Sequence, residues 1–289
     1  MTAATVIGTA ELLPGFEERW ADVRACRMRY FVGGEGPPLV LVHGLSGSAT
    51  NFTLLGPLLA RSRRVLIPEL PGHGRSEPLP AAPSLNGYAD RVRHVAELEG
   101  MLPAPVLGHS LGGAIALRMA LRWPEEVSAL VLAAAAGIAS GTRRAQFWLG
   151  LLGRTRPGRR VSPHRARVAG GRALRYAVFG YFGASDPAAL ADRAVEGLLT
   201  GPELHADVLS ASRALVREDP REDLHEVGCP CLLLWGARDH QVPIEDAFEY
   251  ARRLRAPLRT IADCGHLLVA EHPDACADAV ERFLDPLGL

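Results

Sequence analysis

The feature that most constrains the fold of this 289-residue chain is its alternation of short, mostly apolar runs with longer segments of helical character. The runs cover residues 38–42, 64–68, 105–107, 127–132, 231–235 and 255–261. Short apolar runs between helical segments are typical of parallel strands buried on both faces. We therefore predict an α/β protein with a mostly parallel, doubly wound sheet covered by helices.

The segment 139–226 does not follow this alternation. Its apolar patches recur at helical spacing, and glycines and prolines divide it into short pieces. We predict a core formed by residues 1–138 and 227–289, into which residues 139–226 are inserted as a helical lid above the carboxyl ends of the strands. At the edges of the core, residues 26–32 are expected to form an antiparallel strand, with 20–23 as a partner, and 273–284 a closing helix.

A sharp turn is predicted at Ser110, in the sequence G-H-S-L-G-G of residues 108–113. This sequence lies between the short strand at 105–107 and good helix formers at 114–122. A tight strand-to-helix turn strains the backbone of its serine and requires glycine two residues before and after it. Such a turn exposes the hydroxyl above the sheet and places it at the positive end of a helix. Ser110 is thus a candidate nucleophile.

Serine is a weak nucleophile without a general base, and the base needs an acid to orient it. Asp239 follows the apolar run 231–235, and His266 follows the run 255–261. The order serine, aspartate, histidine, each after a strand, is one that parallel α/β sites use. Asp239 and His266 are therefore the predicted acid and base. Asp263 and Glu69 remain as rival acids, and His272 as a rival base.

Acyl transfer also requires hydrogen-bond donors for a developing oxyanion. One predicted donor is the backbone amide of Leu111, directly after Ser110. The other is the amide of Leu45, in the glycine-containing segment that follows the strand at 38–42. Glycines on either side would let this segment approach a substrate carbonyl closely.

Together these segments are similar to the α/β-hydrolase superfamily, in its lid-bearing serine esterase-like branch. The resemblance lies in H-G-x-x-G-S, L-P-G-H-G-R-S, G-H-S-L-G-G, W-G-x-x-D-x-x-V-P and a final G-H, and it extends from about Arg27 to the end, except for the lid. It implies the α/β-hydrolase fold and a cofactor-free enzyme that works through an acyl-enzyme. Ser110, Asp239 and His266 match the family's triad, and Leu45 and Leu111 match its oxyanion hole. Glu69 replaces the family's frequent aspartate but keeps the charge.

The leading hypothesis is hydrolysis of carboxylic esters with small to medium acyl groups. A serine at position 110 disfavours the epoxide hydrolase and haloalkane dehalogenase branches, which the resemblance would otherwise include. Cleavage of carbon–carbon bonds in ring-cleavage products, lactone hydrolysis and acyl transfer would use the same triad. A non-catalytic small-molecule binding protein is the alternative from another class. Candidate substrate-binding residues are His109, Phe147, Trp148 and Val242, although the aromatic pair would equally serve to anchor the lid.

Composition narrows the possible partners. Lys+Arg and Asp+Glu are balanced at 32 each, so no global field favours nucleic acid. The five cysteines form no C-x-x-C pair, which argues against a disulfide framework or a zinc site. No apolar stretch approaches the roughly 20 residues that span a bilayer, and the amino terminus does not resemble a signal peptide. We expect a cytoplasmic protein with a small-molecule ester substrate, no cofactor, no metal and no membrane span.

Arginine is distributed unevenly along the predicted lid. Residues 127–185 contain ten arginines and no acidic residue, whereas residues 186–226 are rich in acids. The favoured interpretation is that the two halves pair electrostatically across helix faces. The alternative is that some arginines attract an anionic substrate, with Arg143, Arg144, Arg159 and Arg160 as the candidates.

Overall fold

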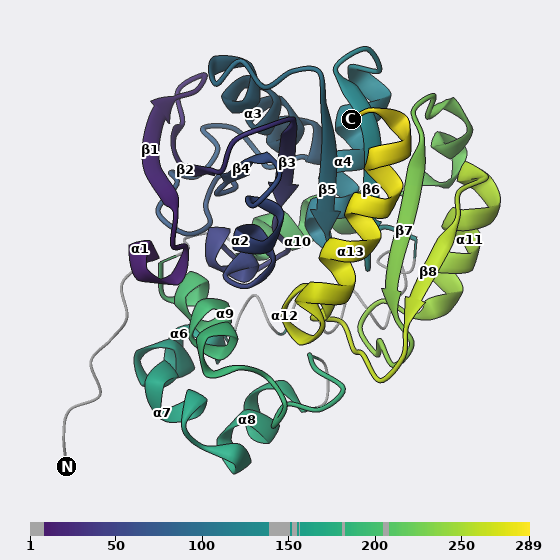
Figure 1. Cartoon of the computed structure of the whole chain (residues 1–289). Coiled ribbons are helices and arrows are strands. Elements are labelled where there is room, and N and C mark those ends of the chain that lie inside the picture. The colour runs from purple at the N-terminus through teal and green to yellow at the C-terminus, as the bar shows by residue number, and fades with distance from the viewer. Residues whose placement is uncertain (1–8, 139–150, 152–154, 156, 181–182, 205–207) are drawn as a thin grey trace.

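The computed structural model describes residues 9–138, 151, 155, 157–180, 183–204 and 208–289, and its centre is an eight-stranded sheet in the order β1-β2-β4-β3-β5-β6-β7-β8 (Figure 1). The strands are β1 Phe16–Asp22, β2 Arg27–Gly33, β3 Pro38–Val42, β4 Arg64–Pro68, β5 Ala104–His109, β6 Val127–Ala133, β7 Cys231–Gly236 and β8 Leu258–Ile261. All neighbouring pairs from β4 to β8 are parallel, and β1, β2 and β4 pair antiparallel. The predicted mostly parallel sheet is confirmed.

Helices cover both faces of this sheet, as Figure 1 shows. Helix α2 (Leu55–Leu59) packs with α13 (Pro273–Leu284) on one face, and α3 (Leu85–Leu98) packs with α4 (Leu111–Arg122) on the other. Helix α11 (Ile244–Leu254) connects β7 to β8. The central strands β3, β5 and β6 are almost fully buried because both of their faces are covered. The carboxyl ends of these buried strands can therefore hold the side chains of a site in fixed positions.

Two strand boundaries differ from the sequence-based expectation. Strand β1 begins at Phe16, because its whole length pairs with β2 although its alternating charged residues give little apolar signal. Strand β8 begins only at Leu258, because Arg255 ends α11 in a left-handed conformation with φ 50°. Both differences come from backbone pairing and helix capping, and the position of an apolar run in the sequence does not predict either of them.

Several helices lie between β6 and β7, within the segment 139–226. They are α6 Pro157–Val161, α7 Arg165–Ala169, α8 Arg172–Phe179, α9 Asp192–Leu204 and α10 Val208–Arg217. Helices α6 to α9 gather at one end of the sheet in Figure 1, and Val168, Phe179 and Val195 belong to a hydrophobic cluster of their own. Helix α10 instead buries Ala211 and Leu215 in the main core. The predicted insertion thus contains both a separate helical layer and a helix that completes the core.

Next to the sheet lies a fully buried ion pair between Arg29 of β2 and Glu69, directly after β4. Arg29 Nε and Nη2 each donate to the Glu69 carboxylate at 2.8 Å, and the amide of Arg75 donates to it at 2.7 Å. Glu69 therefore closes the glycine-rich turn that follows β4. The sequence had offered Glu69 as a rival catalytic acid, but its carboxylate is bonded to Arg29 and the Arg75 amide.

We expect Glu69→Gln to lower the free energy of unfolding by about 3–5 kcal/mol, since it leaves Arg29 buried without its main counter-charge. Urea unfolding monitored by tryptophan fluorescence measures this difference. The matched control is Glu77→Gln, an exposed carboxylate that accepts from the backbone amide of Arg27. Equal free energies of unfolding for wild type and Glu69→Gln would contradict the stabilisation that we expect from the Arg29–Glu69 pair.

Candidate active site

Ser110 lies at the turn between β5 and α4, with φ 55° and ψ −117°, a conformation that a residue with a side chain rarely adopts. Its amide donates to the Ala133 carbonyl at 3.0 Å, and its own carbonyl accepts from Gly113 and Ala136 at 2.9 and 3.0 Å. These bonds to β6 and to the segment after it hold the strained residue in place. The predicted sharp turn is present.

The glycines around Ser110 are required by close backbone packing. A Cβ at Gly108 would lie 2.2 Å from the Gly112 carbonyl oxygen, and a Cβ at Gly112 would lie 2.0 Å from the Val42 carbonyl oxygen. Neither contact is sterically possible. The G-x-S-x-G spacing therefore allows the serine turn to sit directly against the end of β3.

Asp239 and His266 form a buried pair at the carboxyl ends of β7 and β8. His266 Nδ1 lies 2.8 Å from Asp239 Oδ2, and the two residues are only 4% and 7% exposed. The other carboxylate oxygen, Oδ1, accepts from the backbone amides of Gln241 and Val242 at 2.8 and 2.9 Å. An ionised Asp239 can only accept, so the proton of a neutral His266 is on Nδ1 and Nε2 is left to accept another.

The loop that presents Asp239 is held by Trp235, the first residue of the W-G-x-x-D-x-x-V-P segment. Trp235 Nε1 on β7 donates to the Val242 carbonyl at 3.0 Å, while the Val242 amide donates to Asp239. Burial acts to raise the pKa of Asp239, but the neighbouring His266 and the two backbone amides together lower it below its ordinary value. The carboxylate is thus kept ionised in a buried place.

His109 connects the serine turn to the His266 loop. Its ring is 2% exposed, its centroid lies 5.0 Å from that of His266, and its Nε2 donates to the His266 carbonyl at 2.9 Å. Burial, and then repulsion from the charge that His266 can acquire, lower the pKa of His109 to about 3. His109 is therefore a neutral donor that fixes the backbone of His266 next to Ser110.

This buried neutral histidine predicts a pH dependence of stability. Below its ordinary pKa of 6.5, His109 takes up a proton in the unfolded chain but not in the folded one. Its contribution to stability is therefore complete above pH 6.5 and is lost as pH falls toward 3. His109→Gln, whose amide can also donate to the carbonyl, is expected to reduce the stability loss between pH 7 and pH 5 by about 2 kcal/mol.

Urea unfolding of wild type and His109→Gln at both pH values measures this difference. The exposed His225→Gln serves as the control, because it should leave the wild-type pH dependence unchanged. An identical loss of stability between pH 7 and pH 5 in wild type and His109→Gln would contradict a neutral His109 in the folded protein.

The segment after β3 places Leu45 next to the serine turn. Leu70 N donates to His43 Nε2 at 3.0 Å, so the ring proton is on Nδ1, which donates to the Gly44 carbonyl at 2.9 Å. The Gly47 amide donates to the same carbonyl at 3.1 Å. In a trans peptide the amide of Leu45 points away from that carbonyl. A Cβ at Gly44 would lie 3.1 Å from the Ser110 Cβ, so this peptide borders Ser110.

The other predicted residues fall into three groups. Val242 is 8% exposed, and its backbone amide and carbonyl shape the Asp239 loop. Phe147, Trp148, Arg143 and Arg144 lie outside the described residues, whereas Arg159 and Arg160 are exposed on α6.

The rival acid and base do not take part in the Asp239–His266 pair. The Asp263 side chain is 72% exposed and forms an ion pair with Arg238 at 2.5 Å. His272 Nε2 lies 3.4 Å from the Asp263 carbonyl oxygen.

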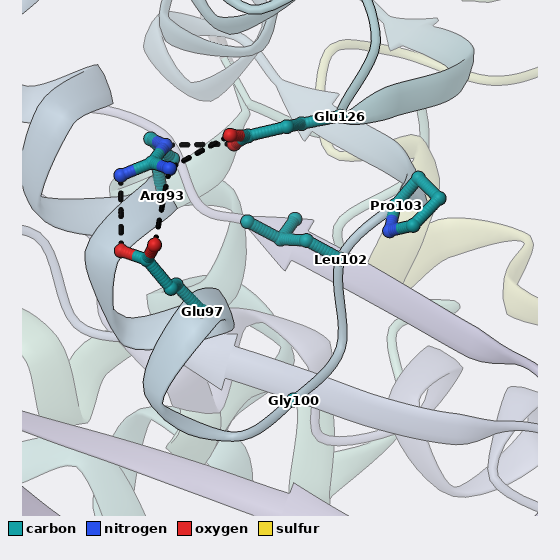
Figure 2. Close-up of a pocket in the computed structure, with 6 residues that line it drawn as sticks. All are labelled: Arg93, Glu97, Gly100, Leu102, Pro103 and Glu126. Atoms are coloured by element: carbon teal, nitrogen blue, oxygen red, sulfur yellow. Dashed lines mark hydrogen bonds and ion pairs between the residues drawn. The ribbon is translucent and has the colours of Figure 1, made fainter.

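Figure 2 shows residues that line a surface cavity of about 250 Å³. It borders Leu102 and Pro103, which precede β5, whereas Ser110 follows β5. Figure 2 shows Arg93 between Glu97 and Glu126, both of which it binds. Two carboxylates therefore neutralise Arg93 beside this cavity.

Among the residues that the structure describes, no group of three or more histidine, cysteine or acidic side chains is arranged to hold a metal ion. In the same residues, no helix is both long enough and apolar enough to cross a bilayer.

The fold agrees with the comparisons to known proteins. The model of the alpha/beta hydrolase family matches residues 39–279, so the chain belongs to that family. It is 32% identical to a pimeloyl-[acyl-carrier protein] methyl ester esterase of Aromatoleum aromaticum, over 85% of this chain and 97% of that protein. It is 30% identical to a 2-hydroxymuconate semialdehyde hydrolase of Pseudomonas sp. (strain CF600), over 87% of this chain and 88% of that protein.

Solved structures show the same fold. A thermophilic esterase from Thermogutta terrifontis superposes with a TM-score of 0.72 at 22% identity, over 93% of this chain and 98% of that one.

Proposed function

We propose that this chain is a serine hydrolase that cleaves carboxylic esters of small to medium acyl groups through an acyl-enzyme. The observation that supports this most is the environment of Asp239. One of its oxygens is occupied by two backbone amides and the other is bonded to His266 Nδ1. This arrangement sets the tautomer in which Nε2 can take a proton from a serine, which a passive receptor would not need.

In the proposed reaction Ser110 Oγ attacks the ester carbonyl while His266 Nε2 accepts its proton. The negative charge on the carbonyl oxygen is stabilised by the amides of Leu45 and Leu111. His266 then returns the proton to the leaving alcohol, and the acyl group remains on Ser110. Water, deprotonated by His266, attacks the acyl-enzyme and releases the carboxylic acid and free serine. Asp239 stabilises the imidazolium in both halves.

We further propose that the helices α6 to α9 act as a lid over this site. The segment that follows α8 is bonded to the loop of the base, because the Gly183 carbonyl accepts from the amides of His266 and Leu267 at 2.9 and 3.2 Å. Helix α9 contacts the segment after Leu45, where Thr50 Oγ1 donates to the Gly197 carbonyl at 2.7 Å. Both contacts place inserted residues next to the proposed machinery, where a lid would exclude water and shape the acyl pocket.

A carbon–carbon bond hydrolase is the second candidate, since a relative that covers most of this chain at 30% identity is a 2-hydroxymuconate semialdehyde hydrolase. Such a reaction would use the same serine and histidine but a substrate with a carboxylate and an enol. The difference between the two candidates depends on the substrate pocket and not on the triad.

The test is turnover of p-nitrophenyl esters of increasing acyl length beside a ring-cleavage dienoate, together with labelling by a fluorophosphonate. We expect rapid ester hydrolysis, a preference for short to medium acyl chains, and a single covalent adduct on Ser110 identified by mass spectrometry. Faster turnover of the dienoate than of every ester would favour the second candidate. Absence of both labelling and turnover would reject a serine hydrolase.

A further inference from the structure

Glu271 is a partly buried carboxylate that the proposed chemistry does not use. It is the last residue of α12 (Leu268–Glu271), five positions after His266. Its Oε2 accepts from the Ser185 amide at 2.7 Å and from the Gly265 amide at 3.1 Å, and its Oε1 lies 3.0 Å from the same Gly265 amide. One carboxylate therefore joins the segment after α8 to the residue that precedes the base.

The two segments that Glu271 joins are in direct contact. The Gly183 carbonyl accepts from both His266 and Leu267, so residues 183–185 run alongside the His266 loop. A Cβ at Gly265 would lie 2.7 Å from the Gly183 carbonyl oxygen and 2.8 Å from the Ser185 amide nitrogen. There is no room for a side chain between them, and a small displacement of either segment would shift the other.

Burial of a carboxylate is costly unless its oxygens are hydrogen-bonded. Burial raises the pKa of Glu271, and the backbone amides of Ser185 and Gly265 oppose that rise. Removal of the carboxylate would leave these two amides without their acceptor. Such amides would turn toward water or toward other acceptors, and the loop that bears His266 would move with them.

His266 is also held from the other side. His109 donates to its carbonyl from the serine turn, and Asp239 accepts from its ring. These two contacts fix the carbonyl and the ring of His266, whereas Glu271 holds the amide of Gly265, one peptide before His266. The loop of the base is thus held by the core through His109 and Asp239, and attached to the inserted segment through Glu271 and Gly183.

We propose that Glu271 is a positioning residue that fixes the His266 loop to residues 183–185 and so keeps the imidazole in register with Ser110. The inference rests on the proposed function, because it concerns the base of that reaction. It assigns to Glu271 no contact with the substrate. Its expected effect is on kcat, since a base displaced by about 1 Å slows proton transfer while substrate binding is little changed.

Three substitutions in the full-length protein test this. Glu271→Ala removes the acceptor, and Glu271→Asp shortens it so that it can no longer reach both amides. Glu271→Gln retains an amide oxygen at the place of Oε2, which can accept from both Ser185 and Gly265. The matched control is Glu281→Ala on α13, which removes a carboxylate bonded to Arg63 and Ser62, away from the His266 loop.

We expect Glu271→Ala to lower kcat for p-nitrophenyl esters by about 10- to 100-fold with KM within about threefold of wild type. Glu271→Asp should fall between Glu271→Ala and wild type, and Glu271→Gln should stay within about threefold of wild type. The rate of fluorophosphonate labelling should follow kcat. Glu281→Ala should lower the thermal midpoint without lowering kcat. Unchanged kcat in Glu271→Ala, or an equal loss in Glu281→Ala, would overturn the proposal.

Amide hydrogen exchange provides a readout that does not depend on turnover. Exchange at residues 265–267 should become at least about tenfold faster in Glu271→Ala than in wild type, with Glu271→Gln close to wild type. Equal exchange in all three proteins would overturn the positioning role whatever their activity. Absence of ester turnover in the wild type would instead reject the proposed function, so the two failures are distinguishable.

Discussion

Ser110→Ala is expected to lower kcat/KM for every hydrolysed ester by about 10³-fold or more. The hydroxyl is the only part of the residue that the proposed reaction uses, and the backbone conformation, with φ 55°, is kept by bonds to Ala133, Gly113 and Ala136 that alanine retains. The variant should therefore fold like wild type and lose the covalent step alone. Fluorophosphonate labelling should disappear with turnover.

The control for this substitution is Ser128→Ala on β6. The Ser128 hydroxyl has no hydrogen-bond partner among the residues that the structure describes, and its strand leads toward the same end of the sheet. We expect turnover by Ser128→Ala to stay within about twofold of wild type, because removal of a hydroxyl without a hydrogen-bond partner changes the stability of the fold little. Ester turnover by Ser110→Ala at the wild-type rate would show that another group is the nucleophile.

Asp239→Asn is also expected to have a large effect, a fall of about 10⁴-fold in kcat near neutral pH. Oδ1 of Asp239 accepts from two backbone amides, so the carbonyl oxygen of an asparagine would take this place. Its NH₂ group would then face His266 Nδ1, which would have to accept instead of donate. The ring proton would move to Nε2, the nitrogen that must take the proton of Ser110.

Initial rates across a pH series, together with urea unfolding, measure this effect. Asp263→Asn is the matched control, because that carboxylate is exposed, pairs with Arg238 and stands three residues before His266. Its activity should stay within about threefold of wild type. If Asp263→Asn caused the large loss and Asp239→Asn did not, the assignment of the acid would be reversed.

Much of the fold is predictable from the sequence because burial on both faces leaves a strong local signal. Strands β3, β4 and β7 are short apolar runs, and the structure forms them within a residue of the expected bounds. The sequence signal did not predict the strand bounds where backbone pairing or helix capping sets them. The charges of β1 conceal a strand that pairs along its whole length with β2, and Arg255 stops α11 before β8 can begin.

The site shows the same division. The G-x-S-x-G spacing predicts the turn at Ser110, because the steric need for glycine is local to the chain. The role of His109 has no local signal, because its hydrogen bond to His266 joins residues separated by 157 positions. Glu271 bonds to Gly265, six positions away, and also to Ser185, 86 positions away. Only folding brings the distant partners together.

What the sequence by itself determined is the class of fold and the order of the candidate serine, acid and base, since apolar runs and glycine spacing follow from burial and sterics within short segments. What only the tertiary structure decided is the choice of partners. Asp239, and not Asp263 or Glu69, is bonded to His266, and Glu69 pairs instead with Arg29. Hydrogen bonds and ion pairs depend on distances of about 3 Å between segments far apart in the chain, and no property of a single segment specifies them.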